Sequence, residues 1–188
     1  SMYQKFKIDF IAAVSKLKVG NPFDTSTDIG ALVSRPHLEK VKMYIDNAAK
    51  YGGKVILGGA SVSVDNSEDG YYLEPTIIEV QDNSCILNQE EIFGPVVTIM
   101  PFNDENEVVA MANDVSYGLS ATLWTNDLKR TMRVSKQIQA GIVWVNTWLL
   151  RDLRTPFGGV KNSGVGREGG FEALRFFTEP KNICIKYN

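Results

Sequence analysis

The spacing of apolar side chains changes along the chain and predicts a series of helices and strands. Apolar residues from Phe6 to Leu17 recur at helical intervals, so an amphipathic helix is expected over about residues 3–17. A second helix is expected over residues 36–51, because Ser34 is suited to cap its start and Gly52-Gly53 to end it.

Continuous apolar runs of strand length follow, and helical segments separate them. This alternation is typical of parallel βαβ units and predicts the α/β class, with an open, mostly parallel sheet and flanking helices. The expected segments are a strand at 54–57, a loop at 61–70, a strand pair or one bent strand at 71–80 broken by Pro75, a strand at 96–102, a helix beginning at 103–107, a strand at 119–124, a helix at 127–139 and a strand at 141–146.

The last third of the chain is richer in turn residues. Residues 155–170 contain seven glycines and prolines, which predicts a tightly turning segment, and a short helix is expected over 171–177. Alternating residues at 182–187 predict a terminal strand with an exposed edge, which pairing with another subunit or packing within the chain would cover. We therefore expect a catalytic domain over 1–178 and an oligomerisation arm over 179–188.

Composition narrows the possible partners. The formal net charge is -2 with no basic cluster, which disfavours nucleic acid, and no apolar run approaches the roughly 20 residues of a membrane span. No signal pattern is present at the N-terminus, so a cytoplasmic location is expected. The single histidine and the two cysteines, Cys85 and Cys184, are too few for a metal site. Cys85 could act as a nucleophile, but a buried structural residue is the more ordinary interpretation.

Three polar motifs have both a chemical and a structural interpretation. The Gly164–Gly169 segment matches G-x-G-x-x-G, yet it does not follow a buried strand, which favours a compact turn over a dinucleotide fingerprint. In Glu90-Glu91, one carboxylate could bind a ribose diol, or both could be surface acids. Arg151 and Arg154 could bind a carboxylate or pair with the nearby Asp152.

Three segments together resemble the aldehyde dehydrogenase superfamily, and the resemblance extends over essentially the whole chain. Within that superfamily, residues 146–159 are most similar to the 2-aminomuconic and 2-hydroxymuconic semialdehyde dehydrogenases. The three segments are Gln89-Glu90-Glu91-Ile92-Phe93-Gly94-Pro95, Tyr117-Gly118-Leu119-Ser120-Ala121 and the run from Pro156 to Glu168.

The resemblance implies oxidation of an aldehyde to an acid with NAD, or with NADP, as the hydride acceptor. In this family a cysteine thiolate attacks the carbonyl, hydride passes to the nicotinamide and water hydrolyses the thioester. The implied site residues are Glu91, Phe93, His37 and Lys40 for the cofactor, Leu149, Arg151 and Phe157 for the substrate, and Glu168 for ordering water or relaying a proton. The cation at position 151 predicts a semialdehyde that carries a carboxylate.

The family's nucleophile motif, general-base Glu, oxyanion Asn and dinucleotide-binding segment have no counterpart in this sequence. The chain alone is therefore expected to be inactive and to bind the cofactor weakly. The full-length enzyme of which it would be part is expected to form a homo-oligomer. Two other interpretations stay open: a subunit-assembly module that uses the terminal strand, and a free-standing cofactor-binding module.

Overall fold

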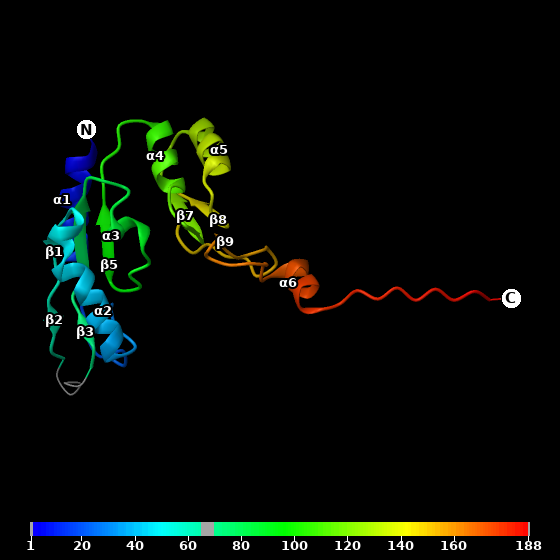
Figure 1. Cartoon of the computed structure of the whole chain (residues 1–188), viewed down its shortest axis with the longest axis horizontal. Helices are drawn as coiled ribbons and strands as arrows, with labels where there is room; N and C mark the ends of the chain where they lie inside the picture. The colour runs from blue at the N-terminus through cyan, green and yellow to red at the C-terminus, as the bar shows by residue number, and fades with distance from the viewer. Residues whose placement is uncertain (1, 65–69, 188) are drawn as a thin grey trace. The chain divides into compact units, whose positions relative to one another are not determined.

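The computed structural model describes residues 2–64 and 70–187, so part of the loop expected at 61–70 lies outside the described residues. The chain forms two compact units, residues 1–102 and residues 103–188 (Figure 1). Both combine helices with small sheets and contain parallel as well as antiparallel strand pairs, which confirms the α/β class. The domain boundary expected after residue 178 stays a prediction.

The first unit is built on a three-stranded sheet in the order β1-β4-β5. Strand β4 pairs antiparallel with β1 and parallel with β5, where Thr76 lies opposite Val96. The elements of this unit are α1 (Met2–Val14), α2 (Arg35–Asp46), the 3₁₀ turn η1 (Ala48–Tyr51), β1 (Gly53–Leu57), β2 (Ser61–Val62), β3 (Tyr72–Leu73), β4 (Thr76–Val80), α3 (Ile86–Gln89) and β5 (Val96–Ile99).

Helix α2 begins and ends on the signals that the sequence carries. The Ser34 side chain accepts a hydrogen bond from the backbone N–H of His37 at 3.3 Å, and a proline occupies the first turn. The expected single helix over 36–51 divides into α2 and η1, and Gly52 then ends η1 in the left-handed conformation with φ 81°. The cap at Ser34 thereby fixes where the His37 side chain leaves the helix.

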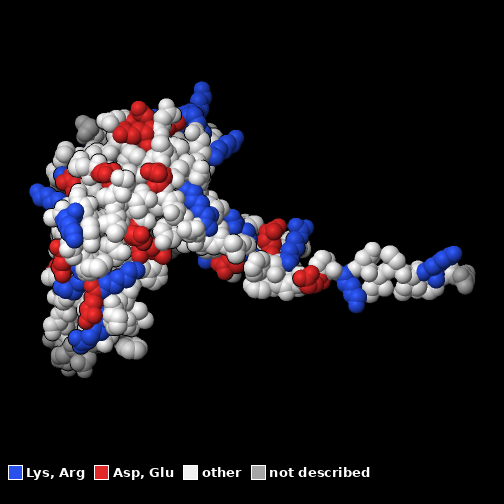
Figure 2. Space-filling view, viewed as in Figure 1, with Lys and Arg blue, Asp and Glu red and all other residues white. Residues whose placement is uncertain are grey.

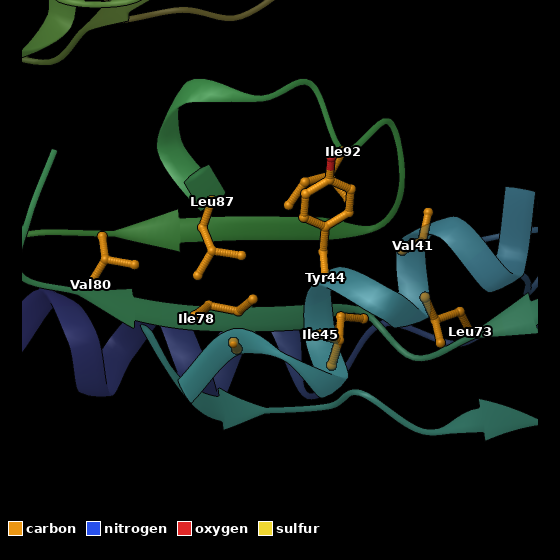
Figure 3. Packing of buried hydrophobic residues seen from close by; sticks show 9 residues of the cluster. Val41, Tyr44, Ile45, Leu73, Ile78, Val80, Leu87 and Ile92 are labelled. Carbon is orange, nitrogen blue, oxygen red and sulfur yellow. The ribbon is translucent and has the colours of Figure 1, made fainter. Parts of the chain in front are cut away.

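The core of this unit lies between α2, α3 and the sheet (Figure 3). It joins Val41, Tyr44 and Ile45 of α2 to Ile78 and Val80 of β4, all of them buried. Leu87 of α3 and Ile92 of the following loop complete the same cluster, as Figure 3 shows. The loop that leads into β5 is therefore anchored in the core rather than lying free on its surface.

The second unit contains a βαβ crossover. Strands β7 and β8 are parallel neighbours, with Ser120 opposite Ile142, and α5 connects them. A second pair, β6 and β9, is antiparallel. The elements are α4 (Glu105–Asn113), β6 (Tyr117–Gly118), β7 (Ser120–Leu123), α5 (Leu128–Gln137), β8 (Ile142–Val145), β9 (Val160–Lys161) and α6 (Gly170–Phe177).

The C-terminal strand expected over 182–187 is not among the strands of the described residues. Residues 178–187 are drawn as a trace without helix or arrow in Figure 1, and they make no ladder hydrogen bonds there. A strand needs a neighbour to satisfy its backbone groups, so this element stays a prediction that depends on a partner.

Figure 2 shows lysine and arginine interspersed with aspartate and glutamate over the visible face. No helix among the described residues has both the length and the hydropathy that a membrane span needs.

Candidate functional site

Two side chains of α2 hold the loop between α3 and β5 by its backbone. The Nε2 atom of His37 lies 2.6 Å from the carbonyl oxygen of Phe93, and Nζ of Lys40 donates to the carbonyl oxygen of Glu91 at 3.3 Å. Positions 37 and 40 are one helical turn apart and so share a face of α2. The four residues that the sequence assigned to the cofactor are thus brought together in the first unit.

The loop presents its side chains alternately to solvent and to the core. Glu91 and Phe93 are exposed, with Phe93 at 72%, whereas Ile92 between them is only 8% exposed. Phe93 has φ 60°, which is uncommon for an aromatic residue and marks a backbone conformation that its surroundings impose. A side chain at the next position would force the buried Val41 to shift, because a Cβ on Gly94 would lie 2.8 Å from the Val41 side chain.

The carboxylate of Glu91 is free to accept hydrogen bonds. It is exposed, and among the described residues no donor is bound to it. A free carboxylate beside an exposed aromatic ring suits a ribose diol, which offers two O–H donors next to an apolar face. Glu91 and Phe93 are thus the two side chains of this group that could contact a ribose, whereas His37 and Lys40 contact the backbone of the loop.

The segment that carries Arg151 leaves the end of β8 and is tied back to it. Asn146, with φ 53°, pairs its side-chain amide with both backbone groups of Thr125, at 2.9 and 2.8 Å. The indole N–H of Trp144 donates to the carbonyl oxygen of Leu150 at 2.9 Å. Leu149, also left-handed with φ 55°, is exposed in this loop. The backbone from which the Arg151 side chain extends is thereby fixed relative to β8.

Arg151 contacts two residues that a backbone pairing holds together. Its Nη2 atom donates to Oε1 of Glu168 at 2.9 Å, and its guanidinium carbon lies 4.1 Å from the ring centroid of Phe157. Phe157 and Glu168 exchange two backbone hydrogen bonds, each 2.8 Å long. Three predicted site residues therefore form one cluster in the second unit.

The two neighbouring arginines have different partners. Arg154 binds Asp152 within the same turn, with Nε 2.9 Å from Oδ1, and this guanidinium holds the pKa of Asp152 below its ordinary value. Arg151 does not pair with Asp152 but reaches Glu168. The local ion pair considered for both arginines is thus observed for Arg154 alone.

The G-x-G-x-x-G segment forms a turn in which Gly166 and Gly169 have no room for side chains. Gly166 has φ 73°, and a Cβ there would lie 2.4 Å from the ring of Phe176. Arg167 closes the turn by donating from Nη1 to the carbonyl oxygens of Gly159 and Gly166, at 2.9 and 2.7 Å. An open cavity of about 350 Å³ lies beside this turn and is lined in part by Phe157 and Glu168. Neither Leu149 nor Arg151 lines it.

Sequence reasoning did not identify Ile92 or Arg167, although both position the site. Ile92 is an aliphatic residue between Glu91 and Phe93, and this alternation could have indicated that its side chain is buried while theirs are exposed. Arg167 lies inside a motif that drew attention to its glycines alone. Its role depends on a carbonyl eight residues away, which no local pattern reveals.

A sequence model described as "Aldehyde dehydrogenase family" matches residues 1–183. The chain belongs to the aldehyde dehydrogenase family. Its similarity to a 2-aminomuconic semialdehyde dehydrogenase from Bos taurus is 46% identity over 100% of this chain, and to a 2-hydroxymuconic semialdehyde dehydrogenase from Pseudomonas sp. (strain CF600) it is 44% over 98%. The chain spans only 39% and 38% of the lengths of these two relatives.

Solved structures of the family have the same fold as this chain. A putative aldehyde dehydrogenase from Burkholderia cenocepacia superposes with a TM-score of 0.89 at 42% identity, over 95% of this chain and 36% of its own. A betaine aldehyde dehydrogenase from Staphylococcus aureus, in complex with NAD+, gives 0.88 at 38% identity, over 94% of this chain and 35% of its own. Membership of this oxidoreductase family and the α/β fold of the chain thus agree with each other.

Proposed function

We propose that the aldehyde dehydrogenase to which this chain contributes oxidises a carboxylate-bearing semialdehyde to the dicarboxylic acid. The observation that carries the proposal is the environment of Arg151. Its guanidinium is fixed against Phe157 and uses one edge for Glu168, and its side chain remains 38% exposed. Arginine presents a planar fork that matches a carboxylate, so an acid group remote from the aldehyde is the chemistry that this cation would recognise.

In this proposal the first unit binds one end of the cofactor. Glu91 accepts hydrogen bonds from the nicotinamide ribose, and Phe93 covers the apolar face beside it. His37 and Lys40 act on the same end of the cofactor by holding the two backbone carbonyls of this loop. NAD would supply the hydride acceptor when bound. The exposed carboxylate of Glu168 orders water near the cavity beside the glycine turn.

The test compares Arg151→Ala with Arg154→Ala in the complete enzyme. The two arginines are three residues apart, but Arg154 is committed to Asp152 and is therefore the matched control. Adipate semialdehyde and hexanal serve as acidic and neutral substrates of equal carbon length. Losing a charged hydrogen bond should lower kcat/KM for the acidic substrate relative to hexanal roughly ten- to hundred-fold in Arg151→Ala only. Equal losses on both substrates would remove the basis for the proposal.

The 188-residue chain itself is proposed to have no dehydrogenase activity. Cys85 is half-buried at the start of α3, and Cys184 is exposed and has Asn182 as a hydrogen-bond partner. Among the described residues no hydrogen bond joins either sulfur to a base that could form the thiolate that the covalent step needs. Following the absorbance of reduced nicotinamide after mixing chain, aldehyde and NAD tests this, and turnover above the protein-free rate would contradict it.

A second function, subunit assembly, is favoured by the C-terminal segment. Ile183, Ile185 and Tyr187 alternate along it and are all largely exposed, the pattern of a strand with one apolar face. We propose that this segment pairs with a second copy of the chain in a homo-oligomer. Light scattering should give a mass above that of one chain, and deletion of residues 179–188 should reduce it; a strict monomer would exclude this role.

A further inference from the structure

The geometry points to Glu168 as the positioning residue for Arg151, which makes it a determinant of selectivity for acidic substrates. The inference rests on the proposed recognition of a substrate carboxylate by Arg151. It differs from the water-ordering role, because here Glu168 acts through the guanidinium rather than on the reacting atoms.

The platform under Arg151 is built by the backbone. The paired hydrogen bonds between Phe157 and Glu168 fix the separation between an aromatic ring and a carboxylate. One glycine behind it, Gly169, has φ 87°, and a Cβ there would lie 2.3 Å from the carbonyl oxygen of Thr155. The chain that carries Glu168 thus packs directly on the loop that carries Arg151.

On this platform the guanidinium has a defined orientation. Phe157 contacts its face, which restrains tilting of the guanidinium plane away from the ring. Glu168 binds one edge, which restrains rotation within that plane. Among the described residues Glu168 is the one hydrogen-bond acceptor of Arg151, which leaves Nε–H and the Nη1 donors for a ligand. The second Nη2 hydrogen joins Nε–H or an Nη1 hydrogen along the edge that Glu168 leaves open, and this pair can bind both oxygens of a second carboxylate while the bond to Glu168 persists.

The charges explain why orientation, rather than attraction, sets the selectivity. Arg151 and Glu168 together have no net charge, so a distant anionic substrate gains little from the pair. A substrate carboxylate gains instead from a fork that is already aligned, because less side-chain entropy is lost when it binds. If Glu168 were only a competing counter-ion, removing its charge would strengthen binding of the acidic substrate.

A double-mutant cycle in the complete enzyme separates these roles. We compare wild type, Glu168→Ala, Glu168→Gln, Arg151→Ala and the Arg151→Ala/Glu168→Ala double variant, and measure the ratio of kcat/KM for adipate semialdehyde to that for hexanal. The ratio cancels any effect of Glu168 on chemistry common to both substrates. Glu168→Ala should lower it about two- to five-fold, the range that an exposed ion pair supports. Glu168→Gln, which keeps an acceptor oxygen, should restore it, and the loss should vanish in the Arg151→Ala background.

The outcomes distinguish the two proposals. If Arg151→Ala leaves the ratio unchanged, carboxylate recognition itself fails, and the role of Glu168 falls with it. If Arg151→Ala lowers the ratio but Glu168→Ala does not, or raises it, only the positioning role is overturned. The same holds if Glu168→Ala lowers the ratio equally without Arg151.

A second measurement uses the 188-residue chain and needs no activity. Nitrogen-15 relaxation of the Arg151 Nε–H group should report an ordered side chain in wild type and Glu168→Gln and a mobile one in Glu168→Ala. The Nε–H group of Arg154, which Asp152 holds, is the internal control and should stay unchanged. Equal order of Arg151 in all three proteins would overturn the positioning role.

Discussion

An alanine at Gly141 should destabilise the second unit, because the added methyl group would collide with the backbone of Gly158, which neighbouring hydrogen bonds hold in place. A Cβ there would lie 1.6 Å from the carbonyl oxygen of Gly158 and 2.7 Å from its carbonyl carbon. The Gly141 N–H donates to the carbonyl oxygen of Gly118 at 3.0 Å, and Phe157, next to Gly158, is bound to Glu168. Relieving the overlap therefore requires one of these pairings to break.

The magnitude follows from the two contributions. Overpacking a tight contact costs about 1–3 kcal/mol, and each backbone hydrogen bond that is lost adds about 1 kcal/mol. The free energy of unfolding should thus fall by about 2–4 kcal/mol. The control is Gly164→Ala, whose φ of 157° also strains an alanine but whose new Cβ would meet only the backbone nitrogen of Gly159, at 3.9 Å, and which should therefore lose less stability.

Urea unfolding followed by tryptophan fluorescence is the suitable assay, because Trp124, Trp144 and Trp148 all belong to residues 103–188. Hydrogen exchange of the Phe157 and Glu168 amides should accelerate in the same variant, since their pairing adjoins Gly158. A Gly141→Ala protein within about 0.5 kcal/mol of wild type, the size of an ordinary surface substitution, would refute the reasoning.

Three further predictions concern the first unit. Gly58→Ala should cost more stability than Gly52→Ala: both have positive φ, 74° and 81°, but only the Cβ at position 58 would collide with backbone, at 2.1 Å, and hydrogen exchange in β4 compares the two. Glu79, which accepts hydrogen bonds from Tyr3 and Lys7 at 2.7 Å, should make this unit acid-sensitive. The bond from Lys7 and that from Tyr3 lower its pKa below 4.5, so the stability it provides is present above that value and is lost as pH falls through the folded-state pKa. Glu79→Gln should flatten this acid limb in pH-dependent urea titrations, and an unchanged limb would contradict the assignment. Tyr3, whose pKa burial raises to about 12, should in turn lose its stabilising effect as pH rises from 10.

The local part of the fold could be predicted because its determinants are local. Ser34 and Gly52 mark the ends of a helical region, and Pro75 separates β3 from β4, all within a few residues of the elements that they delimit. The pairing of β6 with β9 could not be predicted in this way, since Tyr117 and Lys161 are far apart in sequence and each strand has only two residues. Such short strands leave no periodic pattern.

The same distinction applies to the site. Resemblance to the family identified Arg151 and Glu168 separately, but nothing in the sequence joined them, because Asp152 is the nearer acid. The positive φ of Phe93 and of Leu149 was also hidden, since neither residue type favours that conformation. In both cases the tertiary environment overrides the local preference.

The contact between His37 and the Phe93 carbonyl determines how this imidazole holds its proton. A carbonyl oxygen can only accept, so Nε2 must carry hydrogen, and the neutral ring is the Nε2–H tautomer with a bare Nδ1. The doubly protonated ring donates from the same atom, so the loop stays held in either form. Because His37 is the only histidine of the chain, its pair of ring nitrogen resonances would report this choice without overlap.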